Sequence, residues 1–142
     1  MQKFAFSMEK ILDLRRFEQK QAEIELGKAN AEIARIQREL DAVASQVVSV
    51  TKQCDDSAEF MLHYTAQNYF IFLGGKKEKF LNEMAMAQQV ADEKREAVRL
   101  AMQKVKALEK LREKKFAQWK KAYEKHEEEV ADDTAISLAS QE

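Results

Sequence analysis

The side-chain types that most often carry chemistry are scarce in this chain. It has two histidines, His63 and His126, and a single cysteine, Cys54. Neither histidine has a second ligand-type residue at a spacing typical of metal sites, and His126 runs into three glutamates, as on a solvated helix surface. Cys54 falls in step with an apolar series, which indicates a small buried side chain rather than a nucleophile. We therefore expect no metal site and no catalytic cysteine.

The composition also argues against a pocket for a cofactor or substrate. The 142 residues include three glycines and no proline, where average usage would give about ten and roughly seven. Turn-rich folds and phosphate-binding loops need these residues for their backbone angles. The sequence has no Ser/His/Asp arrangement typical of hydrolases. We predict no enzyme activity, no cofactor and no small-molecule substrate.

Apolar residues instead repeat at alternating steps of three and four along two stretches, a pattern typical of the buried seam of a coiled coil. The first series is Ala22, Leu26, Ala29, Ile33, Ile36, Leu40, Val43, Val47 and Val50. The second is Met84, Ala87, Ala91, Val98, Ala101, Val105 and Leu108, with Lys94 as a polar member. Charges of both signs alternate around them, for a net charge of −1. Two seams in one chain predict an all-α fold, a long antiparallel two-helix coiled-coil hairpin.

The phase of each series changes once, and these changes bear on the register of the hairpin. Continuing the first series upstream would put Arg15 and Gln19 at the seam, whereas the apolar residues there are Phe4, Met8, Ile11, Leu14 and Phe17. Beyond Leu108 the apolar set shifts to Phe116, Trp119, Tyr123 and Val130. We interpret both shifts as stutters that face each other. This register places the turn near residue 64 and Ile11 opposite Trp119.

The resulting prediction is a single domain over residues 1–130, followed by a flexible C-terminal tail over 131–142. Helix one covers about 7–58, the turn about 59–65, and helix two about 66–130, with Thr65 as its N-cap. The Gly74–Gly75 pair is the alternative turn, because glycine pairs mark breaks. The start of the chain lacks the apolar core of a signal peptide, and a lone cysteine fits a reducing compartment, so we predict a cytoplasmic protein.

Two stretches stand out as surfaces for partners. Residues 104–125 carry nine Lys or Arg against three Glu, a local charge of +6, which favours an acidic partner surface. The acidic run that follows argues against nucleic acid. Residues 60–73 hold five aromatic side chains close to the predicted turn, more than a two-helix turn can bury. Aromatic residues left exposed there would mark a second partner site.

The residues assembled so far resemble the FliJ family of the flagellar type III export apparatus. The opening segment, residues 4–29, resembles the start of the family, with Phe4, Phe6, Met8, Ile11, Leu14, Arg15 and Ala22 carrying the pattern. The segment 68–73, NYFIFL, resembles the family's start of helix two, and residues 106–125 resemble its basic Leu-x-x-Leu stretch. The terminal box of the family is represented only by residues 131–137.

This resemblance implies a non-enzymatic coiled-coil stalk that inserts into the hexameric flagellar export ATPase and promotes its activity. It also implies contacts with the cytoplasmic part of the membrane export gate and with export chaperones, and thus peripheral association with the inner membrane at the flagellar base. The implied ATPase-binding residues are Phe4, Phe6, Ile11, Leu14, Arg15, Arg112, Lys115, Trp119 and Lys121. The implied gate-binding residues near the tip are Glu39, Val43, Gln46, Val50, Tyr69 and Phe72.

Two other functions are compatible with the same pattern. One is the stalk of a virulence-type secretion complex or of a rotary ATPase, which would have the same physical features and a different hexamer. The other is a nucleic-acid-binding helical protein, which a salt titration with DNA would reveal because phosphate binding weakens steeply with salt.

Overall fold

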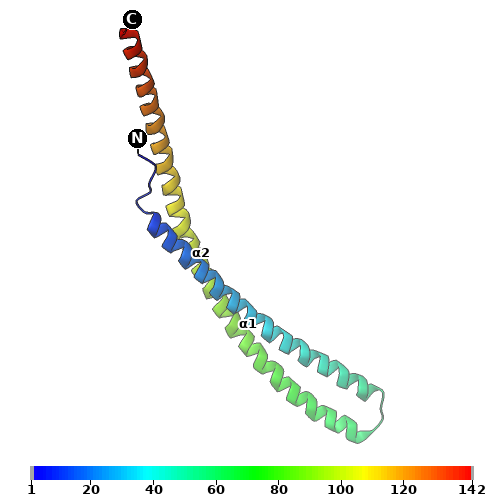
Figure 1. The fold of residues 1–142 in the computed structure, drawn as a ribbon. Coiled ribbons are helices and arrows are strands. Elements are labelled where there is room, and N and C mark those ends of the chain that lie inside the picture. The colour runs from blue at the N-terminus through cyan, green and yellow to red at the C-terminus, as the bar shows by residue number, and fades with distance from the viewer. Residues whose placement is uncertain (1, 142) are drawn as a thin grey trace. The chain divides into compact units, whose positions relative to one another are not determined.

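The computed structural model describes residues 2–141, and they form two helices joined by a short turn. α1 spans Glu9–Asp55, 47 residues, and α2 spans Phe60–Ser140, 81 residues (Figure 1). No strand occurs between residues 2 and 141. The helices run antiparallel and pack on each other through apolar side chains. The prediction of an all-α two-helix hairpin is confirmed.

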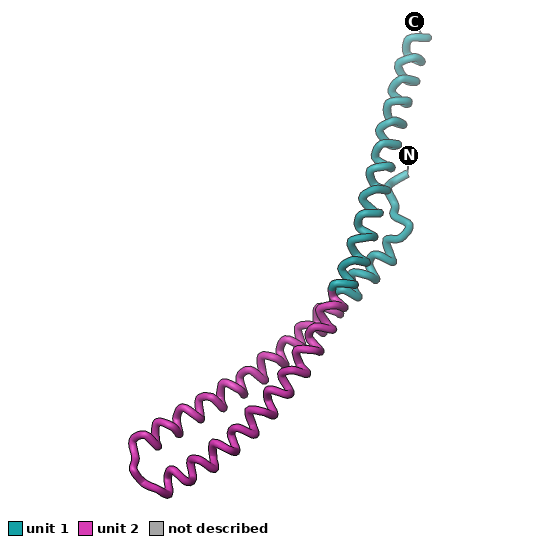
Figure 2. The backbone as a smooth tube through the Cα atoms, turned by 180° about the vertical axis from the view of Figure 1, so that it is seen from behind, with its two compact units in different colours: residues 1–20, 99–142 teal, residues 21–98 magenta. Residues whose placement is uncertain are grey.

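The chain divides into two compact units, and both helices contribute to each (Figure 2). Unit 1 combines the N-terminal residues up to Lys20 with the part of α2 from Arg99 onwards. Unit 2 is Gln21–Val98, which contains most of α1, the turn and the first half of α2. The single domain predicted over residues 1–130 stays a prediction.

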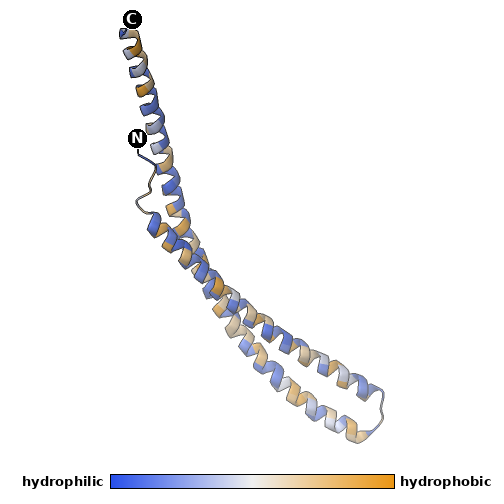
Figure 3. Cartoon of the chain, in the orientation of Figure 1, coloured by the Kyte–Doolittle hydropathy of each residue, from blue (hydrophilic) through white to orange (hydrophobic). Residues whose placement is uncertain are grey.

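The core of unit 2 is the predicted seam. Its buried residues come from both helices: Ile36 and Val43 of α1, and Leu73, Phe80, Met84 and Ala87 of α2. Ile33, Leu40 and Tyr69 pack against this cluster and are half-buried. Much of the remaining surface is charged or polar, and hydrophilic and hydrophobic segments are interspersed along both helices (Figure 3). Burial of one apolar stripe per helix is what stabilises a pair of long helices in water.

The turn occupies residues 56–59, a few residues before its predicted place. The Ser57 hydroxyl accepts a hydrogen bond from the backbone N–H of Glu59 at 3.2 Å, and His63 Nε2 donates to the Ser57 carbonyl at 2.8 Å. These two bonds hold the entry into α2. The helix therefore starts at Phe60 rather than at 66, and Thr65 lies inside it instead of capping it.

Three other helix boundaries differ from the approximate ones that were predicted. α1 begins at Glu9 rather than 7 and ends at Asp55 rather than 58. α2 continues to Ser140, ten residues past its predicted end. No glycine or proline interrupts residues 131–140, and the Thr134 hydroxyl bonds the Val130 carbonyl at 2.8 Å without breaking the helix. The loss of apolar periodicity after Val130 thus reflects the lack of a partner helix rather than the end of the helix.

The alternative turn at Gly74–Gly75 is also wrong, because both glycines lie inside α2. Neither has a positive φ, and a Cβ added at either position would meet nothing within 4 Å. The backbone there needs no glycine, and each glycine costs helix stability relative to alanine.

Unit 1 has its own small core, and it overturns the predicted stutter in helix one. Phe6, Leu12 and Val105 are buried, with Phe4, Met8, Leu108 and Leu111 packed around them. Leu12 is 0% exposed, while Ile11, Leu14 and Phe17 are all exposed. The seam frame therefore continues upstream, and Arg15 and Gln19 occupy it as half-buried residues. Long polar side chains can do this because their aliphatic stems cover apolar neighbours.

Two isoleucine-to-alanine substitutions in α1 test the assignment of the seam. Ile36 is 1% exposed and Ile24 is 46% exposed. We expect Ile36→Ala to lower the free energy of unfolding by about 2–5 kcal/mol, because it leaves a cavity in the unit 2 core. Ile24→Ala, the same chemical change on the outer face, should stay within about 0.5 kcal/mol. Chemical denaturation followed by circular dichroism measures both, and equal losses would contradict the frame.

The glycines of α2 give a second test. We expect Gly75→Ala to stabilise the protein by about 1 kcal/mol, because alanine has the higher helix propensity and its Cβ meets no atom. Gly27→Ala, in α1, is the matched variant with the same open surroundings. A lower melting temperature for either variant would mean that the glycine is required by a bend or a close contact.

Candidate partner-binding surfaces

An aromatic ladder on α2 is the most prominent feature of unit 1. The rings of Phe116 and Trp119 stack at a centroid distance of 5.8 Å, and those of Trp119 and Tyr123 stack at 5.3 Å. Phe4, from the segment before α1, meets Phe116 edge-on at 5.2 Å and Trp119 at 5.9 Å. These geometries are favourable for aromatic pairs. The four rings form one continuous surface, which we call the aromatic ladder.

The segment before α1 is fixed to the ladder by polar contacts as well. Trp119 Nε1 donates a hydrogen bond to the Gln2 carbonyl at 3.1 Å. The Arg112 guanidinium lies 5.6 Å from the centroid of the Phe4 ring, and its Nε donates to Glu9 Oε2 at 2.9 Å. Arg112 therefore connects the ladder to the first turn of α1 through a cation–π contact and an ion pair. A shallow groove borders this junction, between residues 2–5 and the side chains of Lys115 and Trp119.

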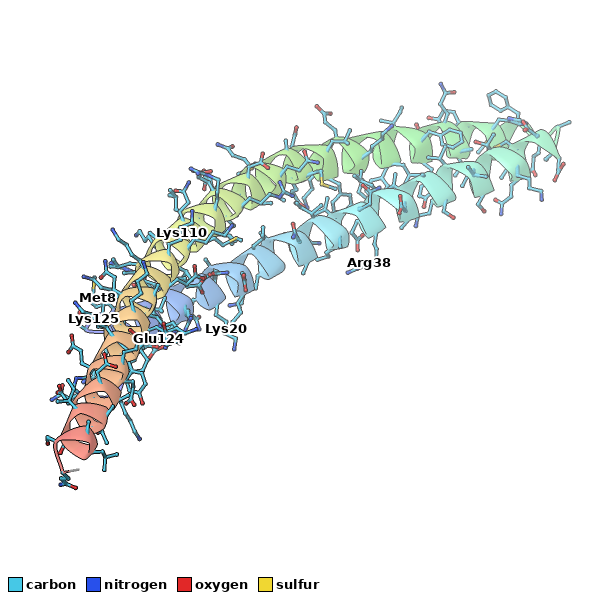
Figure 4. The ribbon with its side chains drawn as sticks, turned by 90° about the horizontal axis from the view of Figure 1, so that it is seen from above. Met8, Lys20, Arg38, Lys110, Glu124 and Lys125 are labelled. Carbon is cyan, nitrogen blue, oxygen red and sulfur yellow. The ribbon has the colours of Figure 1, made fainter. Side chains whose placement is uncertain are left out.

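The ladder remains largely accessible and lies in the basic stretch of α2. Phe116 and Tyr123 are exposed, and Phe4 and Trp119 are half-buried. The exposed lysines Lys115 and Lys121 accompany them, within residues 104–125 of local charge +6. Two further members of this stretch, Lys110 and Lys125, are labelled on α2 in Figure 4. The surface combines apolar contact area with positive charge, as in sites that bind an acidic protein surface.

The structure brings together only part of the predicted ATPase-binding set. Phe4, Arg112, Lys115 and Trp119 meet at the ladder, and Lys121 is exposed further along α2. Phe6 is a core residue. Ile11 and Leu14 are exposed, and Arg15 is half-buried and paired with Glu18 at 2.9 Å. Their role in binding stays a prediction.

The predicted pairing of Ile11 with Trp119 is wrong. Trp119 contacts Gln2 and Phe4, which precede Ile11 by nine and seven residues. The error follows from the stutter that the structure lacks, because the register was derived from it. Phe116 and Tyr123 were assigned to the seam from the sequence, yet both are exposed members of the ladder. Their spacing of three and four from Trp119 was the signal that they share its face.

A second apolar surface surrounds the start of α2 in unit 2. Phe60, Met61, Tyr64, Ile71 and Phe72 are each 57–77% exposed. Orange segments mark this end of the hairpin in Figure 3. Phe72 also stacks on Tyr69, with ring centroids 6.2 Å apart. Exposed apolar residues on this scale, gathered on one short segment, are typical of a protein-binding surface.

The predicted gate-binding residues lie partly in the helix interface. Val43 is buried in the unit 2 core, and Glu39, Val50 and Tyr69 are half-buried. Gln46 and Phe72 are exposed. The buried position of Val43 means that a partner could reach it only if the helices separated. A gate-binding role for these six residues stays a prediction.

Within residues 2–141, few side chains are arranged as a metal site or a catalytic site would require. They contain no cluster of three His, Cys, Asp or Glu side chains able to hold a metal ion. Cys54 is buried, and His63 is bonded to the turn. Hydrogen bonds from Arg35, the shorter at 2.7 Å, lower the pKa of Glu32 on the exposed face of α1. In the same part of the chain, no helix is long and apolar enough to span a membrane.

The fold and its surfaces define a class of protein: an antiparallel helical hairpin with two exposed surfaces on α2 that are suited to binding other proteins. Comparison with known families agrees. The family described as the flagellar FliJ protein matches residues 4–142, and the chain belongs to this family. The family supports a role in flagellar export. Searches of curated proteins and of solved structures found no match.

The contact between Phe4 and the ladder can be tested through Trp119, the single tryptophan of the chain. We expect Phe4→Ala to shift Trp119 fluorescence to longer wavelength and to increase quenching by acrylamide, because the ring loses its cover. Phe17→Ala is the matched control, since Phe17 is 59% exposed in the same unit. Unchanged fluorescence in the Phe4 variant would show that the segment before α1 does not lie on α2 in solution.

Proposed function

We propose that this protein is a non-enzymatic coiled-coil stalk of the flagellar type III protein export apparatus. In this role its ladder end inserts into the hexameric export ATPase and promotes ATP hydrolysis. The other end engages the cytoplasmic part of the membrane export gate and export chaperones. The protein would work in the cytoplasm, peripherally associated with the inner membrane at the flagellar base.

The observation that carries the proposal is the aromatic ladder within the basic stretch of α2. A stalk inside a ring meets several similar subunit surfaces in turn, so its contacts must tolerate small differences in geometry. Stacked rings offer apolar contact without directional hydrogen bonds, and lysines steer an acidic surface over a longer range. Family membership supplies the setting for this surface.

The C-terminal part of α2 supports the same direction of insertion. The segment before α1 reaches Trp119 through Gln2, and the described chain offers α2 no apolar cover from residue 124 to Ser140, all of which is exposed. A helical segment of this length that is exposed on every side is stabilised by a partner. A surrounding ring of subunits would provide such cover.

Charge reversal tests the role of the ladder end. Arg112 is unsuitable because its loss would break the contacts with Phe4 and Glu9. We expect Lys115→Glu, Lys120→Glu and Lys121→Glu together to keep helix content and melting nearly unchanged, since exposed lysines contribute little to folding. Stimulation of the export ATPase should fall at least about tenfold, and wild-type stimulation should weaken with added salt.

The control places the same kind of change in unit 2. Lys76→Glu with Lys77→Glu should leave ATPase stimulation intact and weaken binding to the export gate. Full stimulation by the triple variant, together with loss of stimulation in the double variant, would show that the other end of the hairpin enters the ATPase.

A further inference from the structure

The first four turns of α2 carry an apolar stripe on the face opposite the seam. Phe60, Tyr64, Asn68, Ile71 and Gly75 follow each other at steps of three and four, flanked by Met61 and Phe72. All seven are exposed. Ala66 and Leu73, which point to the other side of the helix, are buried. This segment of α2 is thus apolar on two faces, and α1 covers only one. We call the exposed face the outer stripe.

Two copies of the outer stripe can pack against each other when their helices run in opposite directions with Asn68 at the centre. In an antiparallel pair of α2 helices centred on that residue, Tyr64 of one copy faces Phe72 of the other, twice by symmetry. Met61 faces Gly75, where an added Cβ would meet nothing within 4 Å. Asn68 faces its own copy, and a side-chain amide can both donate to and accept from a second amide. The same patch thus serves both copies, as a two-fold interface requires.

The charges at the two ends of the stripe favour the same orientation. Residues 55–59 contain Asp55, Asp56 and Glu59, a local charge of −3. Residues 76–79 contain three lysines and Glu78, a local charge of +2. An antiparallel pair centred on Asn68 brings the acidic turn of one copy towards the lysines at 76–79 of the other. A parallel pair would place like charges together, which is unfavourable.

From this placement we propose that the outer stripe binds a second copy of the chain, forming an antiparallel, two-fold symmetric contact centred on Asn68. The exposed side chains offer on the order of 500 Å² per copy, judged from their exposed fractions and the size of aromatic side chains. Two such faces lie at the low end for specific interfaces. The contact is therefore a reversible dimer whose population rises with protein concentration. A polar Asn in the middle of an apolar helix contact fixes its register.

Cysteine cross-linking of the full chain tests the register directly. In a Cys54→Ser background, Asn68→Cys should form a disulfide-linked dimer under mild oxidation, because position 68 faces itself. Phe60→Cys should not, since the two copies of residue 60 would lie roughly 24 Å apart along the helices. Mixing Met61→Cys with Gly75→Cys should form a mixed dimer, because these exposed positions face each other. Equal cross-linking of Asn68→Cys and Phe60→Cys would overturn the proposal.

Sedimentation equilibrium of the reduced protein tests the contact without cross-links. We expect Tyr64→Ala with Phe72→Ala to lower the association constant at least about tenfold. Phe17→Ala, which removes an equally exposed ring from unit 1, should leave it unchanged. Lys79→Glu should also weaken association, because it places a negative charge near the acidic turn of the other copy. Circular dichroism checks that every variant keeps its helix content.

Two results would overturn the proposal. One is a wild-type chain that sediments as a monomer at every concentration and gives no Asn68→Cys dimer. The other is a monomer whose Tyr64 and Phe72 substitutions lose only the binding of the export gate or of a chaperone, which would assign the outer stripe to that protein. Neither result bears on the ladder end, so the proposed insertion into the ATPase would stand or fall separately.

Discussion

The structure depends on the mutual burial of one apolar stripe on each of two long helices. In unit 2, Ile36 and Val43 meet Leu73 and Phe80, and in unit 1 Leu12 meets Val105 in a smaller core. The seam uses mostly aliphatic and small residues, so the helices can approach closely. A two-helix contact has no third layer, and most of each helix surface stays in water. Many of the aromatic residues outside the seam therefore lie at the surface.

Both candidate surfaces follow from this constraint. The aromatic ladder forms where α1 has not yet begun, because residues 2–8 give α2 only a narrow cover through Gln2 and Phe4. The outer stripe forms where α2 is apolar on two faces while α1 can cover only one. In each case apolar side chains are exposed because a two-helix protein has no third helix to cover them. This arrangement suits a protein whose work is contact with others, as its family membership indicates.

The sequence was sufficient for the fold class and for most of the seam, because the heptad pattern is a direct record of burial. Ala29, Ile36, Cys54 and Ala91 are buried as the pattern indicated. The heptad pattern was misleading near Arg15 and Gln19, because these polar side chains hold seam positions. The apolar residues Ile11, Leu14 and Phe17 lie outside the seam and are exposed. That one misreading shifted the register and separated Ile11 from Trp119. The contacts of Arg112 with Phe4 and Glu9 could not be predicted, because they depend on that register.

Site-specific photocross-linking in the assembled export apparatus addresses the central claim, that the ladder end of α2 is the part that enters the ATPase. A photoreactive phenylalanine analogue replaces Tyr123, which is exposed on the ladder, or Phe72, which is exposed on the outer stripe. We expect the probe at position 123 to yield an adduct with the export ATPase and the probe at position 72 to yield none. An ATPase adduct from position 72 alone would contradict the claim.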